Sequence, residues 1–304
     1  DLKNPSITNI KEYYKKWYVP NNMAICLSGD FDPDQMIATI DKYFGGLKPN
    51  PDLPKLDLPK ETPITAPVVR EILGPDAESV ALAWRFPGAA DKDVETLQVV
   101  SQILYNGQAG LIDLDLTQQQ KTLSAYCYPM TMSDYSAFMM QGRPKQGQTL
   151  DEVKDLLLGE LKKLREGDFD EKMLEANINN FKLYQMQQLE NNDARADMFV
   201  ESFVNGSDWA DEVTALDRMS KLTKDDIVAF ANKYLKDDNY AVIYKKQGKD
   251  PNEKKMSKPE ITPIVMNRDT VSTFLKEIQA SVVTPIEPVF LDYSKDLTLS
   301  LIHI

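Results

Sequence analysis

The hydrophobic pattern near the start of the chain predicts a helix, a strand and a second helix. From Ser6 to Tyr18, apolar residues recur at helical spacing, and the short apolar run MAICLSG that follows favours a buried strand. A second helical pattern covers Pro33–Phe44. The proline-rich stretch KPNPDLPKLDLPKETPITAP comes next, and no packed element tolerates that density of proline. We therefore expect an extended linker at this point.

A second unit begins at about residue 66. The stretches PVVREIL, SVALAWRFPG, TLSAYCYPM, YSAFMMQGR and NYAVIYKK have strand patterns, with a hairpin expected around Thr131–Asp134. Helical patterns cover Asp91–Tyr105, Ala109–Gln119 and most of residues 150–235. The first stripe of the long helical region consists of Leu150, Val153, Leu157, Leu161 and Leu164. Paired strands and consecutive helices predict an α+β fold, a mainly antiparallel sheet with helices packed on one face.

Composition excludes some classes of function. The chain has 304 residues, of which 47 are acidic and 35 basic, giving a net charge of −12. A nucleic-acid-binding surface would need a basic stripe, so we expect no nucleic-acid partner. No apolar run approaches the length of a membrane span, so we expect no membrane partner either.

Candidate chemistry is sparse. His303 is the only histidine, and histidine-based zinc sites need two or three imidazoles, so we interpret this residue as incidental. Cys26 and Cys127 lie in apolar runs and form neither a disulfide framework nor a zinc ribbon. The glycines of YNGQAG lack the further glycine and the lysine of a phosphate-binding loop.

Three alternate aspartates in GDFDPDQ (residues 29–35) suggest a cation site. A calcium loop counted from Asp30 would need glycine and glutamate where Gln35 and Asp41 stand. A helix start explains the stretch better: Asp32 is the N-cap, the next residue is a proline suited to the first helical position, and Gln35 completes a capping box. We therefore predict a helix cap here and no metal site.

The chain also matches itself. Residues 6–27 align without gaps on residues 223–244, so that Ser6 falls on Thr223 and Asn22 on Asn239. Both segments read as a cap, an amphipathic helix, a polar turn and a buried strand, although any two helix–strand units share some of that likeness. If the duplication is real, the chain holds one truncated module, one complete module and the start of a third. The parent reading frame would then extend well upstream of Asp1.

These segments resemble the pitrilysin/insulinase family of zinc peptidases, the inverzincins. The resemblance rests on YYKKWYVPNNM, SGDFDP and YFGGL, on LTKDDIVAFANKYL, and on TPIEPVFLDYSKDL, and it covers nearly the whole chain. It implies the LuxS/mitochondrial-processing-peptidase-like metallohydrolase fold. The implied divisions are the end of a first domain (residues 1–48), a linker (49–65), a complete non-catalytic second domain (66–246), and a linker with the start of a third domain (247–304).

The resemblance also says where the catalytic metal belongs. In that family the first domain carries H-x-x-E-H on a helix, and its histidines and a later glutamate bind zinc. This chain has no such motif. The resemblance itself leads us to expect that the parent protein is a zinc metalloendopeptidase. In this chain we expect no catalytic residue, no metal ligand, no bound zinc and no activity of its own.

A second family feature concerns substrate binding. The downstream half of these enzymes carries an Arg–Tyr pair in a pattern like L-R-x-K-x-x-L-x-Y, which binds the substrate backbone. The matching stretch here is LTQQQKTLSAY, in which Tyr126 matches the tyrosine but Gln119 replaces the arginine and Leu123 is shifted by one position. Tyr126 is thus the one candidate substrate-binding residue, and ordinary packing in a sheet is its alternative role.

Three hypotheses follow. The first is the non-catalytic portion of a zinc metalloendopeptidase, which acts on unfolded peptides and uses this domain as a wall of its substrate chamber. The second is a catalytically inactive scaffold or partner subunit of the same family, and the third is an unrelated peptide-binding module. The expected partners are unfolded peptides and the remaining domains of the parent chain or a paired subunit. The sequence leaves the compartment open, with a bacterial periplasm or cytoplasm expected.

Overall fold

The computed structural model describes residues 6–55, 58–251, 270–290, 292 and 295. Of the described residues, those up to 251 belong to one compact unit and those after 269 belong to a second. His303 and most of the expected second linker lie outside the described residues.

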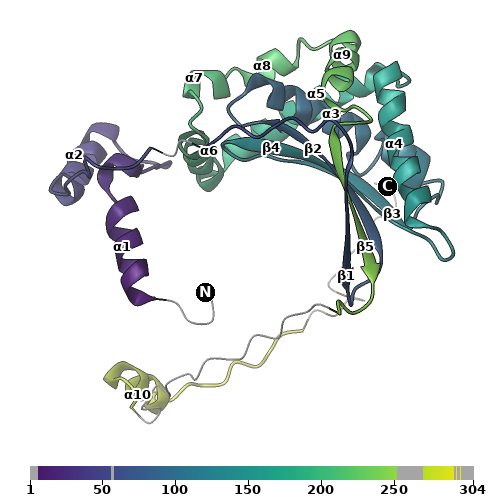
Figure 1. Ribbon diagram of the computed structural model, residues 1–304. Helices are drawn as coiled ribbons and strands as arrows, with labels where there is room; N and C mark the ends of the chain where they lie inside the picture. Colours follow the sequence, from purple (N-terminus) through teal and green to yellow (C-terminus); the bar gives the residue numbers. More distant parts are fainter. Residues whose placement is uncertain (1–5, 56–57, 252–269, 291, 293–294, 296–304) are drawn as a thin grey trace. The chain divides into compact units, whose positions relative to one another are not determined.

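A five-stranded sheet is the centre of the larger unit (Figure 1). Its strands are β1 (Val68–Gly74), β2 (Ser79–Pro87), β3 (Ser124–Met130), β4 (Tyr135–Arg143) and β5 (Tyr240–Gln247), in the spatial order β1-β5-β2-β4-β3. Only the β1–β5 pair is parallel, and the other pairs are antiparallel. The expected mainly antiparallel sheet and the β3–β4 hairpin are therefore confirmed.

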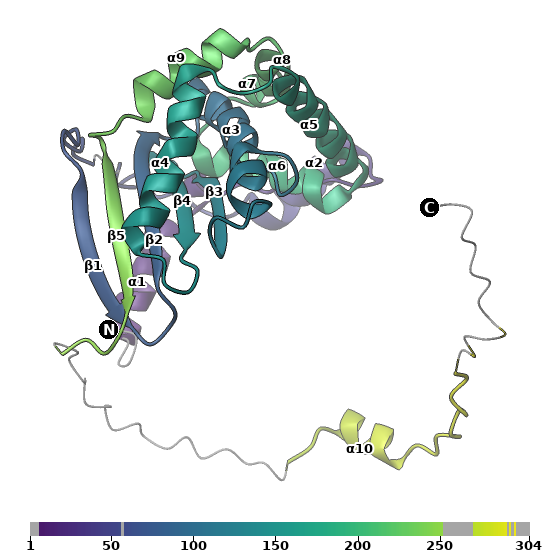
Figure 2. The ribbon, with the colours of Figure 1, turned by 90° about the vertical axis from the view of Figure 1, so that its right-hand side faces the viewer.

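Helices cover one face of this sheet, as Figure 2 shows from the helical side. They are α3 (Lys92–Leu104), α4 (Leu150–Glu166), α5 (Lys172–Glu190), α6 (Asn192–Asn205), α7 (Trp209–Glu212), α8 (Ala215–Met219) and α9 (Lys224–Tyr234). The expected stripe of α4 is buried throughout, and it packs against strand residues such as Leu82 and Phe138, which are also fully buried. Because every second strand residue points at the helices, the sheet alternates between buried and half-buried positions.

One expected helix has a different geometry. The pattern over Ala109–Gln119 predicted an α-helix, but Asp113–Thr117 forms a π-helical turn, η2. The amide of Gln118 donates to the carbonyl of Asp113 at 2.8 Å, which closes the wider turn.

The amino-terminal segment contains the two expected helices, α1 (Ile7–Trp17) and α2 (Pro33–Phe44), with a short 3₁₀ turn, η1 (Pro20–Asn22), after α1. The Asp32 side chain caps α2 by accepting from the amide of Gln35 at 2.9 Å, although Gln35 does not return the second bond of a capping box. The strand expected for MAICLSG is wrong: Met23–Gly29 has no strand structure, and Ile25 is 48% exposed. A strand needs a hydrogen-bonded neighbour, and the described residues supply none here.

The repeated segments end their helices in the same way. The Asn22 amide donates to the carbonyl of Trp17 at 2.9 Å, and the Asn239 amide donates to the carbonyl of Tyr234 at 2.8 Å. The residues that follow the two helices also have similar backbone angles, −89° and 72° against −100° and 64°. Their environments differ, because Ile10 is 56% exposed whereas its counterpart Ile227 is fully buried.

The described part of the second unit contains one helix, α10 (Thr273–Ala280). The Ser272 side chain caps it by accepting from the amide of Leu275 at 3.2 Å. The apolar residues that follow are exposed, with Val282 and Val289 almost completely so.

Candidate functional site

The face of the sheet that the helices leave uncovered is the candidate site, and we call it the open face. The strand register places alternate residues of each strand on it. Its residues are Val68, Arg70, Ile72 and Gly74 of β1; Ala241, Ile243, Lys245 and Gln247 of β5; Ser79, Ala81, Ala83, Arg85 and Pro87 of β2; Tyr135, Ala137, Met139, Gln141 and Arg143 of β4; and Ser124, Tyr126, Tyr128 and Met130 of β3.

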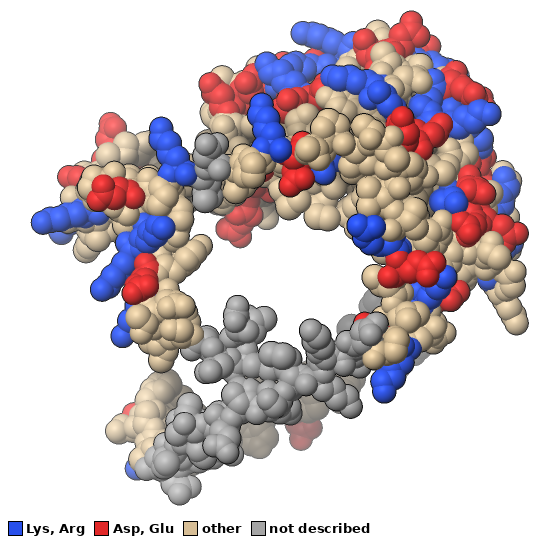
Figure 3. All heavy atoms as spheres, in the orientation of Figure 1, with Lys and Arg blue, Asp and Glu red and all other residues tan. Residues whose placement is uncertain are grey.

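The open face has an unusual composition for this acidic chain. None of its residues is Asp or Glu, although the chain as a whole carries 47 of them. Small side chains occupy its centre, where Ala83 pairs with Met139 on one side and Ala241 on the other. Figure 3 shows mostly uncharged surface over β2 and β4, whereas charged residues crowd the helical side. The small central side chains let the backbone of another polypeptide approach the sheet closely. None of the side chains of the face is a carboxylate that would repel an acidic peptide.

Tyr126 lies on this face, on the edge strand β3. It is half-buried, and its hydroxyl donates to Oε1 of Gln141 on the neighbouring strand. Its ring lies beside those of Tyr128 and Tyr105, with centroid separations of 6.2 and 6.3 Å. Tyr126 and Tyr128 belong to the edge strand β3, whereas Tyr105 follows α3, and the three rings together offer flat apolar surface with polar tips.

Gln119 does not join Tyr126. It lies in the turn after η2, and its side chain donates to Asp115 at 3.5 Å. Arg85 and Tyr135, at the opposite end of the open face, are a second polar pair that we did not predict. The strand alternation contained the signal, because Arg85 continues the row of Ala81 and Ala83 in SVALAWRFPG.

The YNGQAG loop is occupied by its own chain. Oδ2 of Asp113 accepts hydrogen bonds from the amides of Asn106, Gly107 and Gly110 at 3.0, 3.1 and 3.0 Å. Asp113 is 5% exposed, so the loop presents these donors to a buried carboxylate instead of to a ligand. This arrangement also orients Tyr105, which precedes the loop and packs near Tyr126.

A charged cluster links η2 to α4. Lys163 contacts Asp115 at 2.7 Å and Glu160 at 3.0 Å. Glu160 is 3% exposed, and its burial raises its pKa, although hydrogen bonding to Lys163 opposes the shift. Cys127 is buried under α3, and burial raises the pKa of its thiol far above the usual range, so this thiol is not an activated nucleophile.

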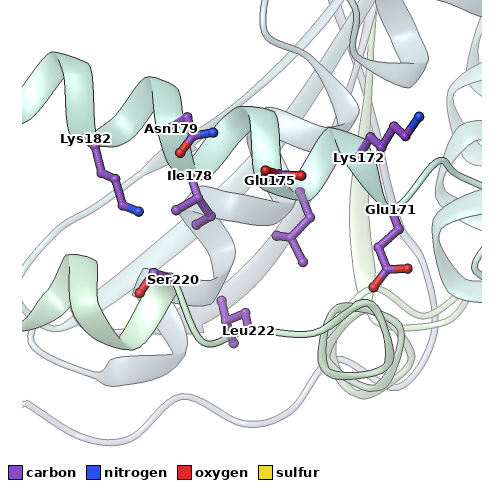
Figure 4. Close-up of a pocket in the computed structure, with 9 residues that line it drawn as sticks. Glu171, Lys172, Glu175, Ile178, Asn179, Lys182, Ser220 and Leu222 are labelled. Atoms are coloured by element: carbon purple, nitrogen blue, oxygen red, sulfur yellow. The ribbon is translucent and has the colours of Figure 1, made fainter.

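The helical side carries a groove of about 490 Å³ between α5 and the segment after α8 (Figure 4). Figure 4 shows Lys182, Asn179 and Glu175 along α5, with Ser220 and Leu222 on the opposite wall. Its charges are mixed, and it contains no nucleophile paired with a base.

No group of three or more His, Cys, Asp or Glu side chains is placed to hold a metal ion within the described ranges. The helices in those ranges are also too short or too polar to cross a membrane.

The larger unit is thus an α+β domain with helices on one face of the sheet and an open face without acidic residues. A sequence model of the peptidase M16 inactive domain matches residues 6–181. The chain belongs to this family, and the matched part is the family's inactive domain. The third hypothesis, that the chain is an unrelated peptide-binding module, is therefore wrong.

Individual relatives agree with this assignment. The chain is 24% identical over 252 residues to the zinc protease PqqE of Helicobacter pylori, a match that covers 81% of this chain and 56% of the relative. A crystal structure of a protease from Helicobacter pylori superposes with a TM-score of 0.75 at 22% identity, covering 80% of this chain and 60% of that one. The periplasmic protease PqqL of Escherichia coli gives a TM-score of 0.62 at 15% identity, covering 80% of this chain and 28% of that one.

The structural likenesses establish the fold alone. The chain spans little more than half the length of the first of these relatives, so the remainder of such proteins lies outside the matched region. The relative PqqE of Helicobacter pylori is named a zinc protease.

Proposed function

We propose that residues 66–246 are the non-catalytic second domain of a zinc metalloendopeptidase and form part of the wall of its substrate chamber. The observation that carries this proposal is the absence of acidic residues from the open face of a chain with a net charge of −12. Its central alanines allow an extended peptide to lie close to the sheet. Tyr126 is the residue we propose to contact that peptide, with Tyr128 beside it.

We propose the domain divisions that the sequence suggested, with residues 1–48 ending a first domain, 49–65 as a linker and 247–304 leading toward a third domain. The shared helix ends at Asn22 and Asn239 support a common origin for the two segments. The exposed apolar face of α1 supports the same idea, since the matching face of α9 is buried against a sheet.

Zinc binding and catalysis belong, in this proposal, to the other domains of the parent chain or to a paired subunit. The domain acts on unfolded peptides only by holding them beside that metal site. We propose a bacterial periplasm or cytoplasm as the compartment, and the periplasmic description of PqqL supports the former.

Peptide binding by the full chain tests the role of the open face. A fluorescein-labelled, 20-residue unstructured peptide is titrated with the chain and followed by fluorescence polarisation. Replacing the central Ala83 with glutamate places an unpaired carboxylate on the face, and we expect the Kd to rise at least about fivefold, roughly 1 kcal/mol.

The matched control is Ala176→Glu, on the exposed surface of α5. Its Kd should equal that of the wild type, and circular dichroism should show both variants folded. The proposal fails if the wild-type chain does not bind the peptide, or if Ala83→Glu binds it as tightly as the wild type.

A further inference from the structure

The proline-rich linker is attached to the open face by two side chains. Nη1 of Arg85 donates to the carbonyl oxygen of Thr62 at 3.0 Å, and the hydroxyl of Tyr135 accepts from the amide of Glu61 at 3.0 Å. One side chain thus satisfies a backbone acceptor and the other a backbone donor on adjacent linker residues. Both hydrogen bonds go to backbone atoms, so neither depends on which side chain the linker carries at that position.

The sheet itself positions the two side chains next to each other. They lie on neighbouring antiparallel strands, where Arg85 pairs with Ala137 and Pro87 pairs with Tyr135. The Arg85 guanidinium also lies over the Tyr135 ring, 5.6 Å from its centroid. A planar guanidinium fixed on an aromatic ring loses little further freedom when it forms a hydrogen bond.

Charge attraction contributes little to this contact. The Glu61 carboxylate is 3.9 Å from Nη2 of Arg85, and the Glu61 side chain is 61% exposed. An ion pair of that length and exposure is worth little in water. The backbone hydrogen bonds therefore decide the interaction.

The linker sequence suits such a site. Pro59 and Pro63 flank the two bonded residues, and proline restricts the backbone to extended conformations. That restriction lowers the entropy lost when the segment is immobilised. Proline also has no amide hydrogen, so the donor at Glu61 does not compete with donors at these flanking positions.

We propose that Arg85 and Tyr135 form a binding site for extended polypeptide backbone, and that its occupant is the chain's own linker at residues 58–63. The site fixes the linker across the end of the open face where β2 finishes and β4 begins. It is independent of whether the rest of the face binds peptides.

Limited digestion of the full chain with trypsin tests the proposal at the Lys60–Glu61 bond. The amide of that bond is the donor held by Tyr135, so a protease must release it before cleaving. In Arg85→Ala we expect cleavage at Lys60 to rise about tenfold, a change of about 1.4 kcal/mol. In Tyr135→Phe, which keeps the ring under Arg85, we expect about a threefold rise. Hydrogen exchange at the Glu61 amide should accelerate in both variants.

Arg143→Ala is the matched control, because Arg143 is on the same face at the far end of β4. Its cleavage and exchange rates should equal those of the wild type, and thermal unfolding should show that all variants keep the fold. Wild-type rates in Arg85→Ala, or an equal rise in Arg143→Ala, would overturn the proposal.

Discussion

Replacing Asp113 with alanine should destabilise the domain strongly and loosen the end of the candidate site. One carboxylate oxygen of Asp113 accepts three backbone hydrogen bonds of 3.0 to 3.1 Å. Hydrogen bonds to charged groups are each worth about 1.5–3 kcal/mol, but such values do not add fully when donors share one acceptor.

The size of the effect depends on which donors water can reach afterwards. The amide of Gly110 is buried, so it loses its partner outright, whereas those of Asn106 and Gly107 are only partly buried. We expect a total loss of about 3–5 kcal/mol, a large share of the 5–15 kcal/mol that stabilises a typical domain. Tyr105 precedes this loop, so its contact with Tyr126 should loosen as well.

Urea unfolding of the full chain, followed by tryptophan fluorescence, to which the fully buried Trp84 contributes, measures the loss. With a denaturant dependence of about 2–3 kcal/mol per molar, the midpoint should fall by about 1.5 M. Replacement of the exposed Asp168 with alanine is the control and should leave the midpoint unchanged. A midpoint for Asp113→Ala within about 0.3 M of the wild type would refute the assigned role of this carboxylate.

Three further predictions concern other parts of the chain. Because burial raises the pKa of Glu160, its contribution to stability is fully present below its unfolded pKa and is lost as pH rises through the folded pKa. In urea unfolding, the free energy of unfolding of Glu160→Gln relative to that of the wild type should therefore be higher at pH 7.5 than at pH 5. A difference between the two proteins that does not change with pH would contradict this. In the same assay, Asn239→Ala should lower the free energy of unfolding by about 1–2 kcal/mol, because two hydrogen bonds are lost. Asn22→Ala should leave the unfolding transition of residues 66–246 unchanged. Equal losses in the two variants would refute the division into separate domains. Elemental analysis of the dialysed full chain should find zinc well below one atom per chain, and stoichiometric zinc would argue against the proposed division of labour.

Local sequence rules determined most of the secondary structure. The stripe from Leu150 to Leu164 predicted the buried face of α4, because helical spacing alone brings these residues together. The cap at Asp32 followed from the preference of a short acidic side chain for the first free amides of a helix. Alternation in the β3–β4 hairpin likewise predicted which residues share a face.

The features that failed or were missed depend on residues distant in the chain. Met23–Gly29 has the sequence of a strand, but a strand forms only when it is hydrogen-bonded to neighbouring strands. Its counterpart in the repeat, β5, has such neighbours, because it lies between β1 and β2 in the sheet. The π-helical turn begins at Asp113, whose carboxylate binds the preceding loop, and hydrophobic periodicity encodes neither feature.

For the candidate site, the sequence determined the residue types and the tertiary structure decided which of them meet. Tyr126 was proposed from its motif, but its hydrogen bond to Gln141 required the register of two strands. The attachment of the linker to Arg85 spans 23 residues and crosses from one strand to an extended segment. A pattern of neighbouring residues cannot specify such a contact, because it arises only when the folded sheet holds the side chain at the linker's path.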